Sequence, residues 1–214
     1  MIVNANGNNS LAYNNFREMP KIPYMIFEKL ATSTSQSAEN LFKALKYATV
    51  DCLSQPNLTL LEKVGLLWTP NISASEQANY NIFLKPLMPN AVDTAEQQQQ
   101  LRIYRYITKP TNRLEAVMAY SFDIYTQEAT CMLIDETDTM VERTDYIEAC
   151  LLDVLNGTDL QVGSSFFSFC TVDNMSSNTI NSLLTISNSK SFYGRTLKLA
   201  LRYVNAGVGG ACGG

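Results

Sequence analysis

The sequence predicts a single α+β domain, in which a mixed or antiparallel β-sheet with a long hairpin is flanked by helices, and both ends of the chain form extended arms. Alternating apolar and polar residues over 114–127 follow a second β-rich run, and amphipathic helical stretches stand before and after this pair. Composition agrees, because 214 residues with 46% hydrophobic and 17% charged residues can bury one globular core. Helices followed by a hairpin, a helix and more strands are typical of the α+β class.

Composition also predicts where the domain begins and ends. Residues 1–24 are rich in Asn, show no helical or strand period, and end with Pro20 and Pro23, so we expect an extended N-terminal arm. Residues 25–204 should form the α+β domain. The glycines of residues 205–214 predict a flexible C-terminal tail.

Two helices joined by a turn are expected before the hairpin. Ser37 is placed to cap the first, over residues 37–53, which the Gln-Pro pair at 55–56 should terminate. Asn57 is placed to cap the second, and the two would form a helical hairpin. The second helix is expected to turn four apolar side chains inward: Leu60, Leu61, Val64 and Leu67.

The central hairpin is expected to join residues 101–108 to residues 114–127 through the turn sequence KPTN. One face of the second strand should be buried, and it carries Leu114, Ala116, Met118, Tyr120, Phe122 and Ile124. The opposite face carries Glu115, Ser121, Asp123 and Gln127. Period 2 with one buried face is typical of an antiparallel sheet that is covered on one side.

Other elements are expected on either side of this hairpin. Further strands should lie within residues 79–87, 131–134, 160–172 and 191–204. Pro86 restricts the first of these to a sheet edge, and Gly163 would make a bend or bulge in the third. Thr144 is a good N-cap for a helix that Asn156 or Gly157 would close, where a positive φ is needed.

Several classes of function are disfavoured by composition. The chain has no histidine, which excludes Ser-His-Asp and Cys-His catalysis and every histidine-based metal site. Its five cysteines show no C-x-x-C spacing, so we expect reduced thiols and neither a disulfide framework nor a zinc site. The net charge of −4 argues against wholesale nucleic-acid binding. We also expect no signal peptide, no membrane span and no cofactor.

Two clusters of charged residues are candidates for binding. Five acids at 135–145 have the residue type that Ca²⁺ or Mg²⁺ prefers: Asp135, Glu136, Asp138, Glu142 and Asp145. The glycine of a calcium loop is missing, and the last two acids suit the start of a helix, so a structural role is favoured.

The second cluster is a basic hairpin with interleaved tyrosines in an otherwise acidic chain. Its candidate interface residues are Arg102, Tyr104, Arg105, Lys109 and Arg113. Such a surface can contact nucleic acid through phosphates and stacked bases, or an acidic protein surface. The net negative charge of the chain favours protein contact.

One segment resembles a known family. Its pattern is R-x-x-x-I-x-x-x-L-x-x-x-LNG followed by VGSSFFSF, and it includes Arg143, Ile147, Leu151, Leu155, Asn156 and Gly157. With the long hairpin before it, this stretch is similar to tail-terminator and tail-completion proteins of tailed bacteriophages, over residues 100–204. The resemblance implies an α+β subunit of a ring in the neck or tail, often sixfold or twelvefold.

The function expected from this resemblance is structural, with no catalysis. It implies copies of the same chain and other neck or tail proteins as partners, DNA passing through the ring without specific binding, and a place in the virion after assembly in the bacterial cytoplasm. Two alternatives stay open. One is a small hydrolase that uses a pair of carboxylates, and the other is a nucleic-acid-binding module that uses the basic hairpin 102–113.

Overall fold

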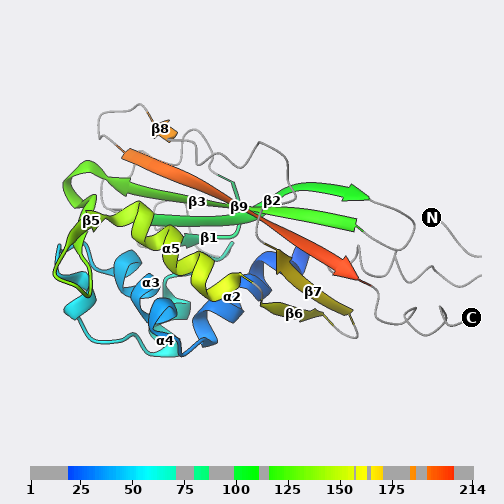
Figure 1. Cartoon of the computed structure of the whole chain (residues 1–214), viewed down its shortest axis with the longest axis horizontal. Coiled ribbons are helices and arrows are strands. Elements are labelled where there is room, and N and C mark those ends of the chain that lie inside the picture. The colour runs from blue at the N-terminus through cyan, green and yellow to red at the C-terminus, as the bar shows by residue number, and fades with distance from the viewer. Residues whose placement is uncertain are drawn as a thin grey trace, which may run out of the picture.

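The computed structural model describes residues 19–70, 80–86, 99–110, 116–156, 158–162, 165–170, 184–186 and 192–204. The expected tail, residues 1–18 of the expected arm, and Arg113 lie outside these ranges. The described part is an α+β fold, which confirms the predicted class (Figure 1). None of the helices described is long and apolar enough to cross a bilayer.

Most strands belong to one large sheet. The helices are α2 (Ile22–Thr32), α3 (Gln36–Lys46), α4 (Leu60–Gly65) and α5 (Arg143–Leu155). The strands are β1 (Ile82–Phe83), β2 (Gln99–Pro110), β3 (Ala116–Gln127), β4 (Met132–Ile134), β5 (Met140–Glu142), β6 (Asp159–Val162), β7 (Ser165–Cys170), β8 (Leu184–Ile186) and β9 (Phe192–Val204). The sheet order is β1-β2-β3-β9-β7-β6, with β8 also on β9, while β4 and β5 form a separate hairpin. β1 is parallel to β2, and the other described pairs are antiparallel.

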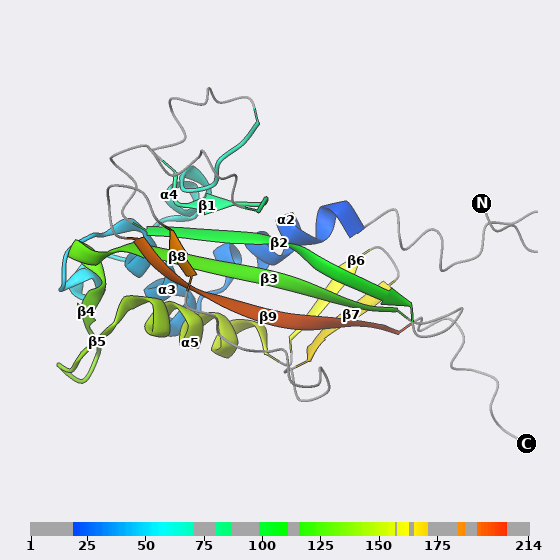
Figure 2. The ribbon, with the colours of Figure 1, turned by 90° about the horizontal axis from the view of Figure 1, so that it is seen from above.

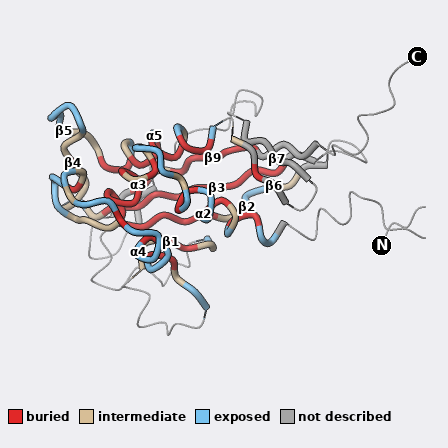
Figure 3. Tube along the Cα trace, turned by 90° about the horizontal axis from the view of Figure 1, so that it is seen from below, coloured by how far each residue is buried: buried red, intermediate tan, exposed pale blue. Residues whose placement is uncertain are grey.

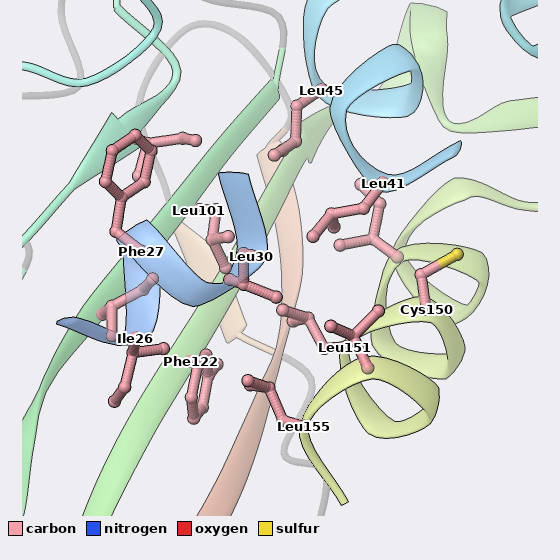
Figure 4. Close-up of a cluster of buried hydrophobic side chains, with 14 of the residues drawn as sticks. Ile26, Phe27, Leu30, Leu41, Leu45, Leu101, Phe122, Cys150, Leu151 and Leu155 are labelled. Carbon is pink, nitrogen blue, oxygen red and sulfur yellow. The ribbon is translucent and has the colours of Figure 1, made fainter. Parts of the chain in front are cut away.

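Helices α2, α3 and α5 cover one face of the sheet (Figures 1 and 2). Alternate residues of three central strands meet them and are at most 4% exposed: Leu101, Ile103, Met118, Tyr120, Phe122, Ile124, Leu197 and Leu199. Leu30, Leu41 and Leu151 fill the space between helices and strands (Figure 4). Each large apolar side chain buried here contributes roughly 1.5–3 kcal/mol, which makes this layer the main source of stability.

The expected N-terminal arm is wrong at its C-terminal end, because helix α2 begins at Ile22. Pro23 lies in the first turn of this helix, where a missing backbone N–H costs nothing. Ile22, Ile26 and Leu30 then recur at helical spacing and are buried. The prolines therefore mark a helix start, whereas the sequence pattern was interpreted as an extended arm.

The caps of the next two helices differ from those expected. Ser35, not Ser37, caps α3, and its Oγ accepts from Ala38 N at 3.2 Å. Ser37 instead donates to Asp153 of α5 at 2.6 Å. The first helix also ends at Lys46, earlier than expected, and α4 is capped by Thr59 rather than Asn57.

The expected inward face of α4 is largely wrong. Leu61 is 82% exposed, and Leu60 and Val64 are exposed too, so only Leu67 of the predicted set is buried. Lys63 points inward instead, with its Nζ 2.7 Å from Glu39 Oε1. Helix α4 has only six residues. The ion pair and the capping box at Thr59 therefore decide which side of the helix faces the core, and they outweigh the spacing of its apolar residues.

The central hairpin is confirmed, with one addition. β2 and β3 pair antiparallel, and the register shifts between Arg105 and Ile107, which leaves Tyr106 as the extra residue of a β-bulge. The expectation of only one buried face is wrong, because Ser121 and Asp123 on the opposite face are also buried. The middle of the sheet is accordingly buried along β3 (Figure 3).

The remaining strands depart from expectation in their pairing. Residues 79–87 contain β1 and residues 131–134 contain β4, although β4 pairs with β5 outside the large sheet. Residues 160–172 are not one bulged strand, because the chain reverses between Val162 and Ser165 to form the antiparallel pair β6 and β7. Gly163 itself lies outside the described residues. The last predicted strand is confirmed as β9.

Helix α5 ends as predicted but begins differently. Its N-cap position is Glu142, and the Thr144 hydroxyl donates to Glu142 Oε1 at 2.6 Å instead of capping the backbone. The helix ends at Leu155, and Asn156 follows with a φ of −64°, so no positive φ occurs there. Gly157 is outside the described residues.

Arg143, the first residue of α5, is fully buried and holds several segments together. Its guanidinium donates to the carbonyl oxygens of Ala44 at 2.9 Å, Tyr47 at 2.9 Å and Thr49 at 2.8 Å, and so satisfies the C-terminal end of α3. Its Nε donates to Thr130 O at 2.7 Å. Burial lowers the pKa of Arg143, and the described contacts are carbonyls and the Cys52 thiol, with no carboxylate.

Replacing Arg143 with alanine should strongly destabilise the fold. The change leaves carbonyls of three segments buried without donors, so we expect the free energy of unfolding to fall by about 3–5 kcal/mol. Urea denaturation measures this. Arg195→Ala is the matched control, because its ion pairs with Glu142 and Asp145 are partly exposed and should contribute less than about 1 kcal/mol. Equal losses for the two variants would contradict the role of Arg143.

Gly194 permits a close approach between β9 and β3. A Cβ at this position would lie 2.2 Å from Ile124 O and 2.7 Å from the Tyr125 ring. Gly194 is paired with Tyr125, whose ring therefore packs over bare backbone. By contrast, a Cβ at Gly65 would meet nothing within 4 Å.

Gly194→Ala should therefore destabilise the protein by more than about 2 kcal/mol, because the backbone of β3 cannot give way without breaking its pairing. Gly65→Ala should be neutral or stabilise by up to about 1 kcal/mol, because alanine restricts the unfolded chain. Thermal melts of the two variants test the contrast. A stable Gly194→Ala protein would show that the approach of the two strands is looser than described.

Candidate functional site

The polar residues of the sheet gather on the face that the helices leave uncovered. Strand register places Arg102 opposite Asp123 and Asp123 opposite Thr196. The next row joins Tyr104, Ser121 and Lys198. These two rows, together with Tyr125, form what we call the polar face: Arg102, Tyr104, Ser121, Asp123, Tyr125, Thr196 and Lys198.

The Asp123 carboxylate is the centre of the polar face and is 4% exposed. Tyr104 Oη donates to Oδ2 at 2.7 Å, and Tyr125 Oη approaches the same oxygen at 3.5 Å. Ser121 and Thr196 donate to Oδ1 at 3.0 and 2.9 Å. Four hydroxyls thus replace the water that a buried carboxylate loses.

The tyrosines remain donors over a wide pH range. Burial raises the pKa of Tyr104 to about 12, and burial together with the nearby Asp123 charge raises the pKa of Tyr125 above its usual value. A carboxylate whose lone pairs already accept hydroxyl protons is poorly placed to act as a general base. The arrangement is that of a rigid polar network across β2, β3 and β9.

Arg102, predicted to lie at an interface, is instead 1% exposed. Its Nη2 and Nε donate to Gln100 Oε1 at 2.8 and 3.2 Å, and its Nη1 donates to Pro86 O at 3.3 Å. The guanidinium also lies 4.4 Å from the centre of the Phe83 ring. Burial lowers its pKa to about 10, and the residue ties β1 to the sheet rather than reaching a partner.

The other candidate residues of the basic hairpin lie in different surroundings. Tyr104 is part of the polar face, while Arg105 is exposed. Tyr106 and Ile107 follow at the bulge and are 53% and 45% exposed, and Lys198 Nζ lies 4.1 Å above the Tyr106 ring. The side chain of Lys109 and the whole of Arg113 are outside what the structure describes. The described surface of the hairpin is therefore the bulge, residues 105–107.

The described residues support neither the hydrolase with a pair of carboxylates nor a Ca²⁺ or Mg²⁺ site in the acidic loop. Their buried acids, Asp123 and Glu148, lie on opposite sides of β3, so they are not a facing carboxylate pair. In the acidic loop, Asp135 Oδ1 accepts from Thr137 N and Thr139 N at 2.8 and 2.9 Å. These bonds lower its pKa and give it a turn-forming role. Among the described residues, no group of three potential ligands could hold a metal ion.

Sequence reasoning missed two of the residues that matter most here. Asp123 was assigned to a solvent face, although a charged residue between aromatic residues in a long central strand signals a buried network. Lys198 stands in the sequence as one polar residue of an alternating strand, with no local sign of its contact. The contact of Lys198 with Tyr106 depends on the bulge, which no local pattern in the hairpin indicates.

The described residues form an α+β fold with a buried polar network, and the family match identifies the chain as phage-associated. A family model described as YomW matches residues 38–201, and the chain belongs to this family. The match includes the hairpin, α5 and most of β9, and leaves α2 outside. Neither the curated proteins nor the solved structures gave a match.

The hydrogen bonds to Asp123 should differ in strength in the order of their lengths. Tyr104→Phe removes a short bond to a buried charge and should lower the free energy of unfolding by about 1.5 kcal/mol or more. Tyr125→Phe removes only a 3.5 Å contact and should cost less than about 1 kcal/mol. Urea denaturation of both variants tests this, and the reverse order would contradict the described network.

Proposed function

We propose that this chain is a structural subunit of a ring in the neck or tail of a tailed bacteriophage, and that it has no catalytic activity. Membership of a phage-associated family supports a role in phage biology but does not specify a ring. The position within the virion and the homo-oligomeric state are part of the proposal.

The observation that carries the proposal is the outer edge of β2 towards the hairpin end of the large sheet, with which no described strand pairs. β2, β3 and β9 have 12, 12 and 13 residues and reach beyond α3 and α5 at the hairpin end (Figure 2). β1 pairs only with Leu101 and Arg102, and no other described strand pairs with the outer edge of β2. A long open edge with exposed aromatic and apolar residues favours association with another chain.

The chemistry of the described residues supports a structural role over the two alternatives. The Asp123 carboxylate accepts from hydroxyls, and Arg102, one of the basic candidates, is buried. The net charge of −4 suits a ring through which DNA passes without being held, because like charges repel.

Light scattering after gel filtration, followed by negative-stain electron microscopy, tests the ring. The full-length chain should give a mass that is a multiple of 23.8 kDa and particles with cyclic symmetry. A single chain at every concentration, with no ring on addition of disrupted virions of the parent phage, would overturn the proposal.

A DNA mobility shift distinguishes the nucleic-acid alternative. The proposal expects no shift with duplex or single-stranded DNA at low salt. A shift that weakens with added salt and disappears in Arg105→Ala would favour the nucleic-acid-binding module instead.

A further inference from the structure

We infer that neighbouring copies of this chain associate head to tail, with the tip of the β4–β5 hairpin of one copy docked against the β2 bulge of the next. The tip comprises residues 136–140, and the bulge comprises residues 105–107 with Lys198 beside it. This inference rests on the proposed ring and names the contact that would build it.

The two surfaces have opposite charge. At the bulge, Arg105 is exposed with no ion-pair partner among the described residues. Its strand partner is Tyr120 of the helix-covered face, while Lys198 contacts the Tyr106 ring on the polar face, so the bulge carries a cation on each side of the sheet. At the tip, Glu136 and Asp138 are exposed. Glu136 already accepts from Tyr146 and Asn40. Asp138 is therefore the carboxylate at the tip that is available to a neighbour.

The conformation of Asp138 is that of a hairpin turn. Its φ is 57°, and it is the one residue other than glycine with a positive φ in the described chain. Aspartate tolerates this conformation, and Asp138 N donates to Asp135 O at 3.2 Å to close the turn. The turn therefore presents the Asp138 side chain at the end of the β4–β5 hairpin.

Both surfaces also expose large apolar side chains. Met140 beside the tip is 60% exposed, and Tyr106 and Ile107 at the bulge are 53% and 45% exposed. A flexible thioether and an aromatic ring pack well against each other. Burial of these groups around an Asp138–Arg105 ion pair gives an apolar contact with a charge pair that fixes its register.

The positions of the two surfaces allow a contact that repeats from copy to copy. The β4–β5 hairpin lies at one end of the long axis of the molecule, and the hairpin end of β2 lies towards the other (Figure 1). A contact between two different surfaces is heterologous, so it repeats from copy to copy and closes where the rotation permits. A self-complementary contact would stop at a dimer.

Both surfaces are held rigidly. Arg143 N donates to Cys131 O at 2.6 Å and its side chain donates to Thr130 O, which anchors the start of β4. The tip is further braced by the bonds of Asp135 to Thr137 and Thr139. The bulge directly follows the strand segment that Tyr104 fixes to Asp123. Rigid partners lose little entropy on association.

The test measures assembly of the full-length chain by light scattering over a concentration series. Asp138→Asn keeps a residue that tolerates a positive φ but removes the charge. Arg105→Ala removes the opposite charge from an exposed site. Each variant should raise the concentration at which rings form by about tenfold. Glu128→Gln, which removes an exposed acid elsewhere, is the matched control and should assemble like the parent chain.

A charge exchange gives a second, independent readout. Arg105→Asp and Asp138→Lys should each prevent assembly alone. An equimolar mixture of the two variant chains should recover rings with an even number of subunits, because in an alternating order Asp138 meets Arg105 at one contact and the introduced lysine meets the introduced aspartate at the next. The chain that carries both changes should recover closed rings. Added salt should weaken the parent more than Asp138→Asn.

The outcomes separate this inference from the proposed ring. Rings that form equally well with Asp138→Asn and Arg105→Ala would overturn the head-to-tail contact and leave the ring standing. An equal effect of Glu128→Gln would show a response to net charge only and would also overturn it. A parent chain that never assembles would overturn the proposed function and the contact together.

Discussion

The described structure depends on one buried guanidinium, that of Arg143. It joins the end of α3, the link that follows this helix, and the start of β4 to the first turn of α5. These segments are far apart in the sequence, and each brings carbonyl groups that helix or sheet pairing leaves without donors. A planar group with five donors can satisfy several at once, which lysine cannot. Without it, the β4–β5 hairpin would lose its fixed relation to the helical layer.

A second polar centre, Asp123, gives the opposite side of the sheet its rigidity. The helix-covered face is held by apolar burial, whereas the other face is held by hydroxyls that converge on one carboxylate. Both centres are internal, and the described hydrogen bonds already occupy their polar groups. The proposed assembly therefore uses the outer surface at the two ends of the described part of the molecule.

Sequence patterns predicted the elements whose period is long and regular. The β2–β3 hairpin, α5 and β9 fall where alternation or helical spacing places them, because the hydrophobic pattern there agrees with the tertiary packing. The failures occur where one long-range contact overrides local pattern. Lys63 pairs with Glu39 and turns the leucines of α4 outward, and Pro23 starts a helix that Ile22 and Ile26 bury. Arg143 was recognised only as part of a family-like motif, since its carbonyl partners come from segments that no periodicity brings together.

The central claim is that copies of this chain form a ring through the two ends of the molecule. A cryo-electron microscopy reconstruction of the assembled full-length chain tests it most directly. The account predicts a cyclic particle in which the β4–β5 hairpin of each subunit meets the β2 bulge of its neighbour. Particles no larger than one chain, or subunits that share neither surface with a neighbour, would contradict it.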